Sequence, residues 1–114
     1  MTSRNRRSTY ILDQAAACGI NFIDTAECYG DHLSERLIGD YLSRRDRSRW
    51  IVAHKIRPLL PQFHAPHGRL YSRQRATQLE SSLRSLRVET IDLYQFHSGI
   101  DDSFRNARTV DDAR

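Results

Sequence analysis

The apolar and polar positions of this 114-residue chain fall into two alternating kinds of segment. Three segments carry apolar residues three or four positions apart, which is the spacing of one helix face. Between them lie short apolar runs typical of strands buried on both faces of a parallel sheet. The predicted helices begin at Ser8 or Thr9 and stop before Gly19, span Asp31 to Arg45, and run from Ser72 through Leu86; the predicted strands are residues 20–23, 50–53 and 91–96.

This alternation predicts an α/β fold in which all three strands are parallel, because helices serve as crossovers between them. We expect the polar, basic residues 1–8 to form a disordered lead. Residues 56–71 contain all three prolines and are expected to be a long irregular loop. The polar tail over 98–114 is expected to hold at most one helical turn, or to be disordered.

An ionisable side chain follows each predicted strand. Asp24 follows the first, Lys55 follows the second after His54, and His97 follows the third. The carboxyl ends of parallel strands meet at one rim, and the loop that carries Tyr29 starts there too. Taken singly, each residue is more commonly a turn, surface or core residue. Together, the four residue types complete a proton-transfer relay.

The four residue types fit proton donation to a substrate at neutral pH. A free tyrosine has a pKa of about 10, too high for ready proton donation. The ammonium group of Lys55 would stabilise the phenolate of Tyr29 and lower that pKa. Asp24 would pair with Lys55 and fix its position, and His97 would hydrogen-bond the substrate oxygen.

Composition narrows the function classes. The net charge is +4, but the 14 acidic residues are interleaved with the basic ones, which argues for solvated helix faces and against a nucleic-acid partner. Lys55 is the only lysine among 18 basic residues. No run approaches the roughly 20 apolar residues of a membrane span, and no secretory signal is evident, so we expect a cytoplasmic protein without a membrane partner.

Cysteines and histidines suggest no further chemistry. Cys18 and Cys28 lie at opposite ends of the first predicted strand, so we expect free thiols. His64 and His67 lack a third ligand in register, so no metal site is predicted.

Four motifs carry a resemblance to a known family. The segments GINFIDTAECYG (19–30), SERLIG (34–39), AHK (53–55) and YQFH (94–97) strongly resemble the aldo-keto reductases. The resemblance implies a (β/α)8 TIM barrel that transfers hydride from NADP(H) to aldehydes and ketones. It also implies that Asp24, Tyr29, Lys55 and His97 are the catalytic tetrad, with Tyr29 as proton donor and Asp24 as a cofactor contact. His54 stands where the family usually has threonine, which implies altered packing beside the nicotinamide.

The extent of the resemblance leaves two functions open. It runs from about Tyr10 to His97, whereas a complete barrel needs about 250 residues. Residues 9–97 are thus expected to form an N-terminal portion of a barrel, a partial TIM barrel without the first strand or anything after the fourth. One hypothesis is a truncated oxidoreductase that reduces a small-molecule carbonyl substrate. The other is a catalytically silent half-barrel, a fragment or an assembly module, whose open sheet is covered by self-association or by a partner.

Overall fold

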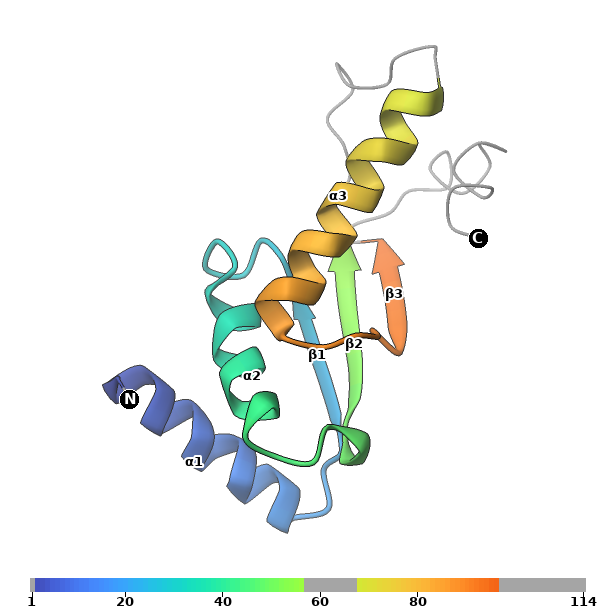
Figure 1. Ribbon diagram of the computed structural model, residues 1–114. Coiled ribbons are helices and arrows are strands. Elements are labelled where there is room, and N and C mark those ends of the chain that lie inside the picture. Colours follow the sequence, from blue (N-terminus) through green and yellow to red (C-terminus); the bar gives the residue numbers. More distant parts are fainter. Residues whose placement is uncertain (1, 57–67, 97–114) are drawn as a thin grey trace.

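The computed structural model describes residues 2–56 and 68–96 and has alternating helices and strands (Figure 1). The three strands form one parallel sheet in the order β1-β2-β3, so the predicted α/β architecture is confirmed. In chain order the elements are α1 (Ser3–Ala17), β1 (Phe22–Ala26), α2 (Leu33–Ser43), the 3-10 turn η1 (Arg47–Arg49), β2 (Ile51–Ile56), α3 (Gly68–Leu86) and β3 (Leu93–Phe96).

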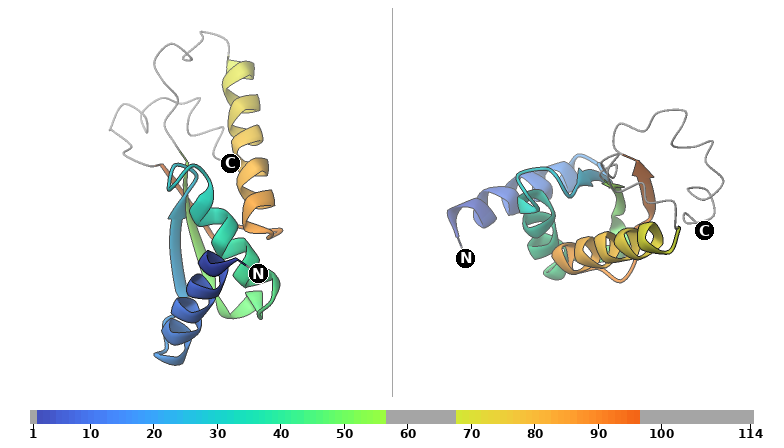
Figure 2. Two further views of the ribbon diagram at one scale, coloured as in Figure 1. Left: turned by 90° about the vertical axis from the view of Figure 1, so that its left-hand side faces the viewer. Right: turned by 90° about the horizontal axis from the view of Figure 1, so that it is seen from above.

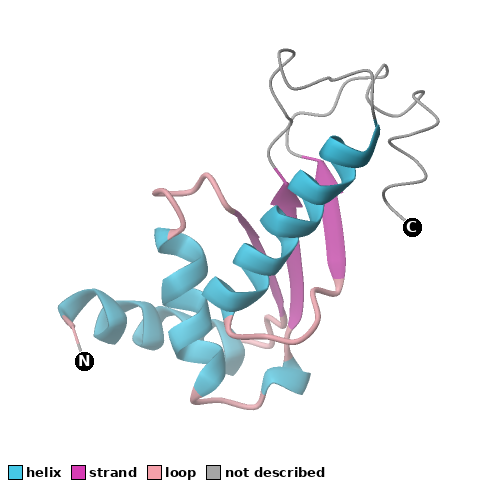
Figure 3. Ribbon diagram, turned by 45° about the horizontal axis from the view of Figure 1, so that its top comes forward, coloured by secondary structure: helices cyan, strands magenta, loops and turns pink. Residues whose placement is uncertain are grey.

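Helices α2 and α3 lie on one side of the sheet, and the core forms between them and the strands (Figures 2 and 3). The sheet contributes Ile23 and Val52 to this core, and the helices contribute Ile38, Leu42 and Leu86. All five side chains are at most 8% exposed. Because burial of apolar area is the main favourable term in folding, this cluster is what holds the helices on the sheet.

The opposite face of the sheet is open in the described part of the chain. Phe22, Ile51 and Leu93 lie on this face and are 47%, 43% and 45% exposed. Ala26 and Ala53 share this face by register and are 0% exposed, so the face is covered in part, and the expectation of burial on both faces fails at Phe22, Ile51 and Leu93. We call this side of the sheet, which also carries Asp24 and Lys55, the open face.

Two helices pack closely at a glycine. Gly39 of α2 faces the last turn of α3, where a Cβ atom at position 39 would lie 2.3 Å from the backbone oxygen of Ser85 and 2.8 Å from the carbonyl carbon of Leu86. These are backbone atoms, which cannot swing away as a flexible side chain can. The absence of a side chain at this position is therefore required by the approach of α3.

Strand β3 is fixed to β2 at its start by Asp92. The Asp92 backbone N–H donates to the Val52 oxygen at 3.0 Å, and its carboxylate Oδ2 accepts from the Val52 N–H at 2.8 Å. The same oxygen accepts from Arg47 of η1 at 2.9 Å. The hydrogen bond from Val52 and the contact with Arg47 lower the pKa of Asp92, so the carboxylate stays ionised at neutral pH.

Element boundaries differ from the prediction at the amino-terminal ends of the helices. Helix α1 begins at Ser3, because the side chain of Thr2 caps it by accepting from the Asn5 N–H at 3.1 Å. Residues 3–8 are therefore helical, whereas a disordered lead was expected. Helix α3 likewise begins at Gly68, before the expected cap at Ser72. None of the helices in the described ranges is long and apolar enough to cross a membrane.

The strands extend further than the apolar runs indicated. Strand β1 continues to Ala26 and β2 to Ile56, so Asp24, His54 and Lys55 lie within strands and do not follow them. The physical reason is that each strand continues past the polar residue that ended its apolar run. Asp24 of β1 lies on the exposed side of the sheet, and His54 of β2 is a buried polar residue. The predicted irregular loop over 56–71 is wrong at its two ends, because Ile56 belongs to β2 and residues 68–71 belong to α3. Residues 57–67 and the tail over 98–114 lie outside the described residues.

Candidate active site

Asp24 and Lys55 form an ion pair across two neighbouring strands on the open face. The Lys55 Nζ lies 2.5 Å from the Asp24 Oδ2. In the β1–β2 register Asp24 is opposite Ala53 and Ala26 is opposite Lys55, so the two side chains share a face and lie two residues apart along the strands. Partial burial of Lys55 acts to lower its pKa, but the hydrogen bond and charge of Asp24, with a smaller contribution from Tyr29, raise it overall. Lys55 is therefore a permanent cation at neutral pH.

Tyr29 lies against the same cation. It comes from the loop between β1 and α2, and the Lys55 Nζ is 5.7 Å from the centroid of its ring. The ring remains 40% exposed, so its surroundings are open enough for a small molecule to reach it. The structure thus brings together Asp24, Tyr29 and Lys55, while His97 lies outside the described residues.

The Tyr29 loop makes an unusual backbone turn before α2. Gly30, Asp31 and His32 have φ angles of 62°, 50° and 66°, three left-handed residues in succession. Only glycine adopts this conformation without steric cost, so Asp31 and His32 are strained. Backbone hydrogen bonds close the turn, from the His32 N–H to the Glu27 oxygen at 2.9 Å and from the Leu33 N–H to the Gly30 oxygen at 3.2 Å.

A buried acidic residue connects this loop to the sheet. Glu35 of α2 is 0% exposed, and its two carboxylate oxygens accept from the Nε2 of His54 at 2.5 Å and from the Nδ1 of His32 at 2.7 Å. Burial alone would raise the pKa of Glu35, but the hydrogen bonds from the two histidines outweigh it and lower the pKa. We call these three residues the Glu35 network.

The sequence analysis missed this network. Glu35 shares a helix face with Ile38 and Leu42 by its spacing of three and seven positions. That spacing was the available signal of burial. An acidic residue on an apolar face also requires a buried partner, and His54 is the partner.

His54 lies on the covered face of the sheet. It is 0% exposed, it stacks on Tyr94 with ring centroids 5.7 Å apart, and its Nδ1 has no hydrogen-bond partner among the described residues. Its neighbour Lys55 points to the open face, because successive side chains of a strand alternate. The side chain of His54 thus packs beneath α2, on the opposite face of the sheet from Asp24 and Lys55. Its expected effect on packing beside the nicotinamide stays a prediction.

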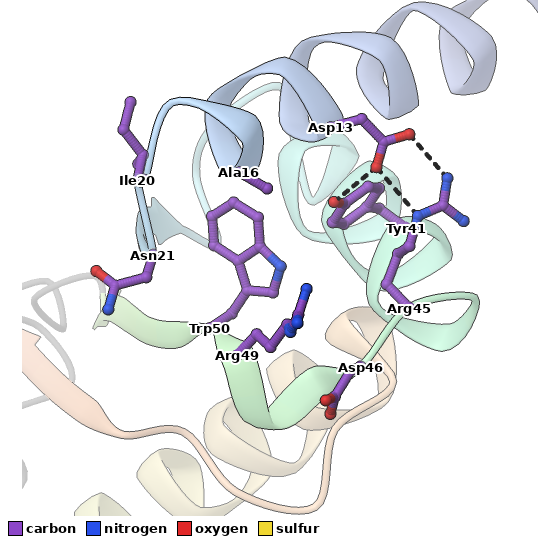
Figure 4. Close-up of a pocket in the computed structure, with 10 residues that line it drawn as sticks. Asp13, Ala16, Ile20, Asn21, Tyr41, Arg45, Asp46, Arg49 and Trp50 are labelled. Atoms are coloured by element: carbon purple, nitrogen blue, oxygen red, sulfur yellow. Dashed lines mark hydrogen bonds and ion pairs between the residues drawn. The ribbon is translucent and has the colours of Figure 1, made fainter.

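A hollow lies at the other end of the strands, away from Asp24, Tyr29 and Lys55. It has a volume of about 470 Å³ and is lined by residues that precede β1 and β2, including Asn21 and Trp50, together with parts of α1 and α2 (Figure 4). At its rim Arg45 binds Asp13 through two hydrogen bonds of 3.0 and 2.8 Å. Asp24, Tyr29 and Lys55, the candidate residues that the structure describes, do not line this hollow.

The cysteines are free, as predicted, with Cys18 exposed and Cys28 partly buried. His64 and His67, which were considered as metal ligands, lie outside the described residues.

Comparison with known proteins identifies the family. The model of the aldo/keto reductase family matches residues 3–103, most of the chain. The chain belongs to this family. Among curated relatives, an uncharacterized oxidoreductase of Mycobacterium bovis is 40% identical over 87 residues, covering 76% of this chain and 24% of that protein. The 6-dehydroglucose reductase of Novosphingobium aromaticivorans is 35% identical over 115 residues, covering 90% of this chain and 36% of that protein.

Solved aldo/keto reductases share the fold of the chain. A Bacillus halodurans enzyme in its holo form superposes with a TM-score of 0.72 and 28% identity, over 95% of this chain and 36% of that one. A Klebsiella pneumoniae aldo/keto reductase in complex with NADP and acetate superposes with a TM-score of 0.74 at 23% identity, over 98% of this chain and 35% of that one. The chain therefore spans about a quarter to a third of the length of the proteins it matches, and it has the fold of part of their (β/α)8 barrel.

Proposed function

We propose that this chain contributes the proton-donating part of an NADP(H)-dependent reductase that converts aldehydes or ketones to alcohols. The observation that carries the proposal is the meeting of Tyr29, Lys55 and Asp24 on the open face, in a member of a family of oxidoreductases. An ion pair alone is common on protein surfaces. A tyrosine beside the cation of that pair, near the carboxyl end of parallel strands, supports a role in proton transfer.

Tyr29 is the proposed proton donor. As the carbonyl is reduced, its oxygen takes the phenolic proton: the O–H bond of Tyr29 breaks and the O–H bond of the alcohol forms. The phenolate that remains is stabilised by the Lys55 ammonium group, whose raised pKa keeps it charged. Asp24 holds Lys55 in place through the 2.5 Å contact. The proposed partner of the substrate oxygen, His97, remains a prediction from the sequence.

The residues present fit a nicotinamide cofactor. Asp24 keeps 47% of its side chain exposed while paired with Lys55, so an oxygen lone pair remains available for a polar group of NADP(H). When bound, the cofactor supplies the hydride that reduces the carbonyl carbon. The protein's part is to orient the carbonyl beside Tyr29 and to provide the proton.

Replacement of the proton donor tests the proposal. We expect Tyr29→Phe to lower carbonyl-dependent NADPH oxidation by about 100-fold or more, because general acid catalysis typically contributes 10²–10⁴. The assay is the loss of NADPH absorbance with a panel of small aldehydes and ketones. Cofactor binding is followed in parallel by the fluorescence of NADPH itself, because Trp50 precedes β2 and lines the hollow at the other end of the strands.

Tyr10→Phe is the matched control, since it removes the hydroxyl of a tyrosine that is 65% exposed on α1. It should leave both the rate and cofactor binding unchanged. Equal activity in the Tyr29→Phe variant would remove Tyr29 from the mechanism. Absence of NADPH binding by the original chain would rule out the reductase proposal for this chain alone.

The open face supports a second candidate, an assembly module. Phe22, Ile51 and Leu93 are apolar and exposed there, and β1 and β3 are edge strands within the described sheet. Exposed apolar faces and unpaired edges favour association with another chain. Sedimentation velocity over a range of protein concentrations distinguishes the candidates: a well-behaved monomer at all concentrations would contradict self-association.

A further inference from the structure

The position of Tyr29 relative to Lys55 depends on how a loop is attached to a strand. Lys55 is part of β2, whereas Tyr29 belongs to the loop after β1. A strand inside a sheet is held on both sides by backbone hydrogen bonds, but a loop needs other attachments. The residues that attach this loop therefore determine whether the phenol lies over the cation.

The Glu35 network is such an attachment. His54 is the residue next to Lys55 in β2, and His32 follows Tyr29 by three positions in the loop. Both histidines donate to the same buried carboxylate, at 2.5 and 2.7 Å. The network thus joins the strand that carries the cation to the loop that carries the phenol, through a group with no access to solvent.

The conformation of the loop needs contacts that hold it, and backbone hydrogen bonds supply only part of them. His32 is a non-glycine residue in the left-handed region, immediately after a second one, Asp31. Such strain persists only where surrounding contacts hold it. The side-chain contact of His32 with Glu35 holds the end of the turn at the start of α2, where Thr25 and Ser34 also connect β1 to the helix through a 2.8 Å hydrogen bond.

We propose that Glu35, His32 and His54 are positioning residues that hold Tyr29 over Lys55 from the opposite face of the sheet. This inference rests on the proposed function for the catalytic role of the Tyr29–Lys55 contact, whereas the contact itself is observed in the structure. The three residues touch no reacting atom. They act through the turn of the loop on one side and through the backbone of β2 on the other.

The test uses the single lysine of the chain. Because Lys55 is the only lysine, protein labelled with ¹³C-lysine gives one side-chain NMR signal that needs no assignment. Its titration midpoint is measured in the original chain, in Tyr29→Phe, in His32→Gly and in the double variant, without cofactor or substrate. Glycine at position 32 removes the imidazole and accepts the left-handed backbone, so the loop loses its attachment and its strain together.

In the original chain, Tyr29→Phe should lower the Lys55 midpoint, because Tyr29 contributes to its raised pKa. In the His32→Gly background, we expect Tyr29→Phe to shift the Lys55 midpoint by less than about half of the shift in the original chain. A smaller shift would show that Tyr29 and Lys55 have moved apart. Asp40→Asn is the control background, since Asp40 lies on α2, as Glu35 does, but pairs with Arg44 at the surface. In this background Tyr29→Phe should shift the Lys55 midpoint as much as in the original chain.

An undiminished shift in His32→Gly would overturn the proposal. If circular dichroism shows that His32→Gly is unfolded, His54→Thr provides the second background, because it removes the other donor to Glu35 and leaves the loop sequence intact. An undiminished shift there would equally contradict it. If Tyr29→Phe has no effect on Lys55 in the original chain, the Tyr29–Lys55 contact of the proposed function fails instead, so the two failures are distinguishable.

Discussion

The close approach of α2 and α3 makes a definite prediction for Gly39→Ala. The added Cβ would lie 2.3 Å from the Ser85 oxygen and 2.8 Å from the Leu86 carbonyl carbon. An ordinary contact requires the helices to separate by roughly 1 Å, and no side-chain rotation can provide that distance. Separation loosens the packing of Leu86, which is 0% exposed.

The magnitude follows from two opposing effects. Overpacking typically costs about 1–3 kcal/mol, and a clash with backbone belongs at the upper end of that range. Alanine is a better helix former than glycine by about 1 kcal/mol, which offsets part of the cost. We therefore expect Gly39→Ala to lower the free energy of unfolding by about 2 kcal/mol.

Urea unfolding followed by the fluorescence of Trp50 measures this loss. Trp50 is 5% exposed and packs edge-to-face on Tyr41 of α2, with centroids 5.9 Å apart, so its emission reports on the packing of that helix. The midpoint should fall while the slope stays the same. Gly19→Ala is the comparison variant. Gly19 has a φ of +84°, and a Cβ added there would have nothing within 4 Å, so any loss of stability would arise from the backbone conformation alone. A Gly39→Ala variant as stable as the original would refute the close packing.

Two further predictions concern acid stability and association. Because the pKa of Glu35 is lowered, its ionised form adds stability above the ordinary carboxyl value of 4.5, and this is lost as the pH falls through the lower folded value. Glu35→Gln should therefore show a flatter loss of melting temperature between neutral and acid pH; equal slopes would exclude Glu35 as the linked group. If the chain self-associates through the open face, Phe22→Ser with Ile51→Thr should weaken association and change its stability little; unchanged association would place the contact elsewhere.

The sequence predicted the architecture well and the burial of its strands poorly. Helical spacing and short apolar runs located every described α-helix and strand, because both patterns are local. The open face was not predictable in the same way. An apolar residue such as Phe22 or Ile51 looks the same whether another element covers it or not, so the pattern does not reveal which faces of a sheet are covered.

The candidate site was likewise predictable where the signal is local and not where it depends on a distant residue. Asp24, Tyr29 and Lys55 were found from residue types at strand ends, and a displacement of the strand boundaries by two or three residues did not change which side chains meet. Glu35 was missed, because its role depends on a histidine 19 positions away on another element. A long-range partner of this kind is visible only once the register of helix and sheet is known.

The Asp92 contacts bear on which side chains face each side of the sheet. A strand moved along its neighbour by one residue would turn Leu93 toward the helices and Tyr94 outward. The carboxylate of Asp92 accepts a hydrogen bond from the Val52 N–H, and the Asp92 N–H donates to the Val52 oxygen. A shift of register would therefore leave the Val52 N–H and the Val52 oxygen without these partners. Asp92 thus fixes the register of β3, and a one-residue insertion between Asp92 and Leu93 would exchange the side chains that face the helices with those that face the open side.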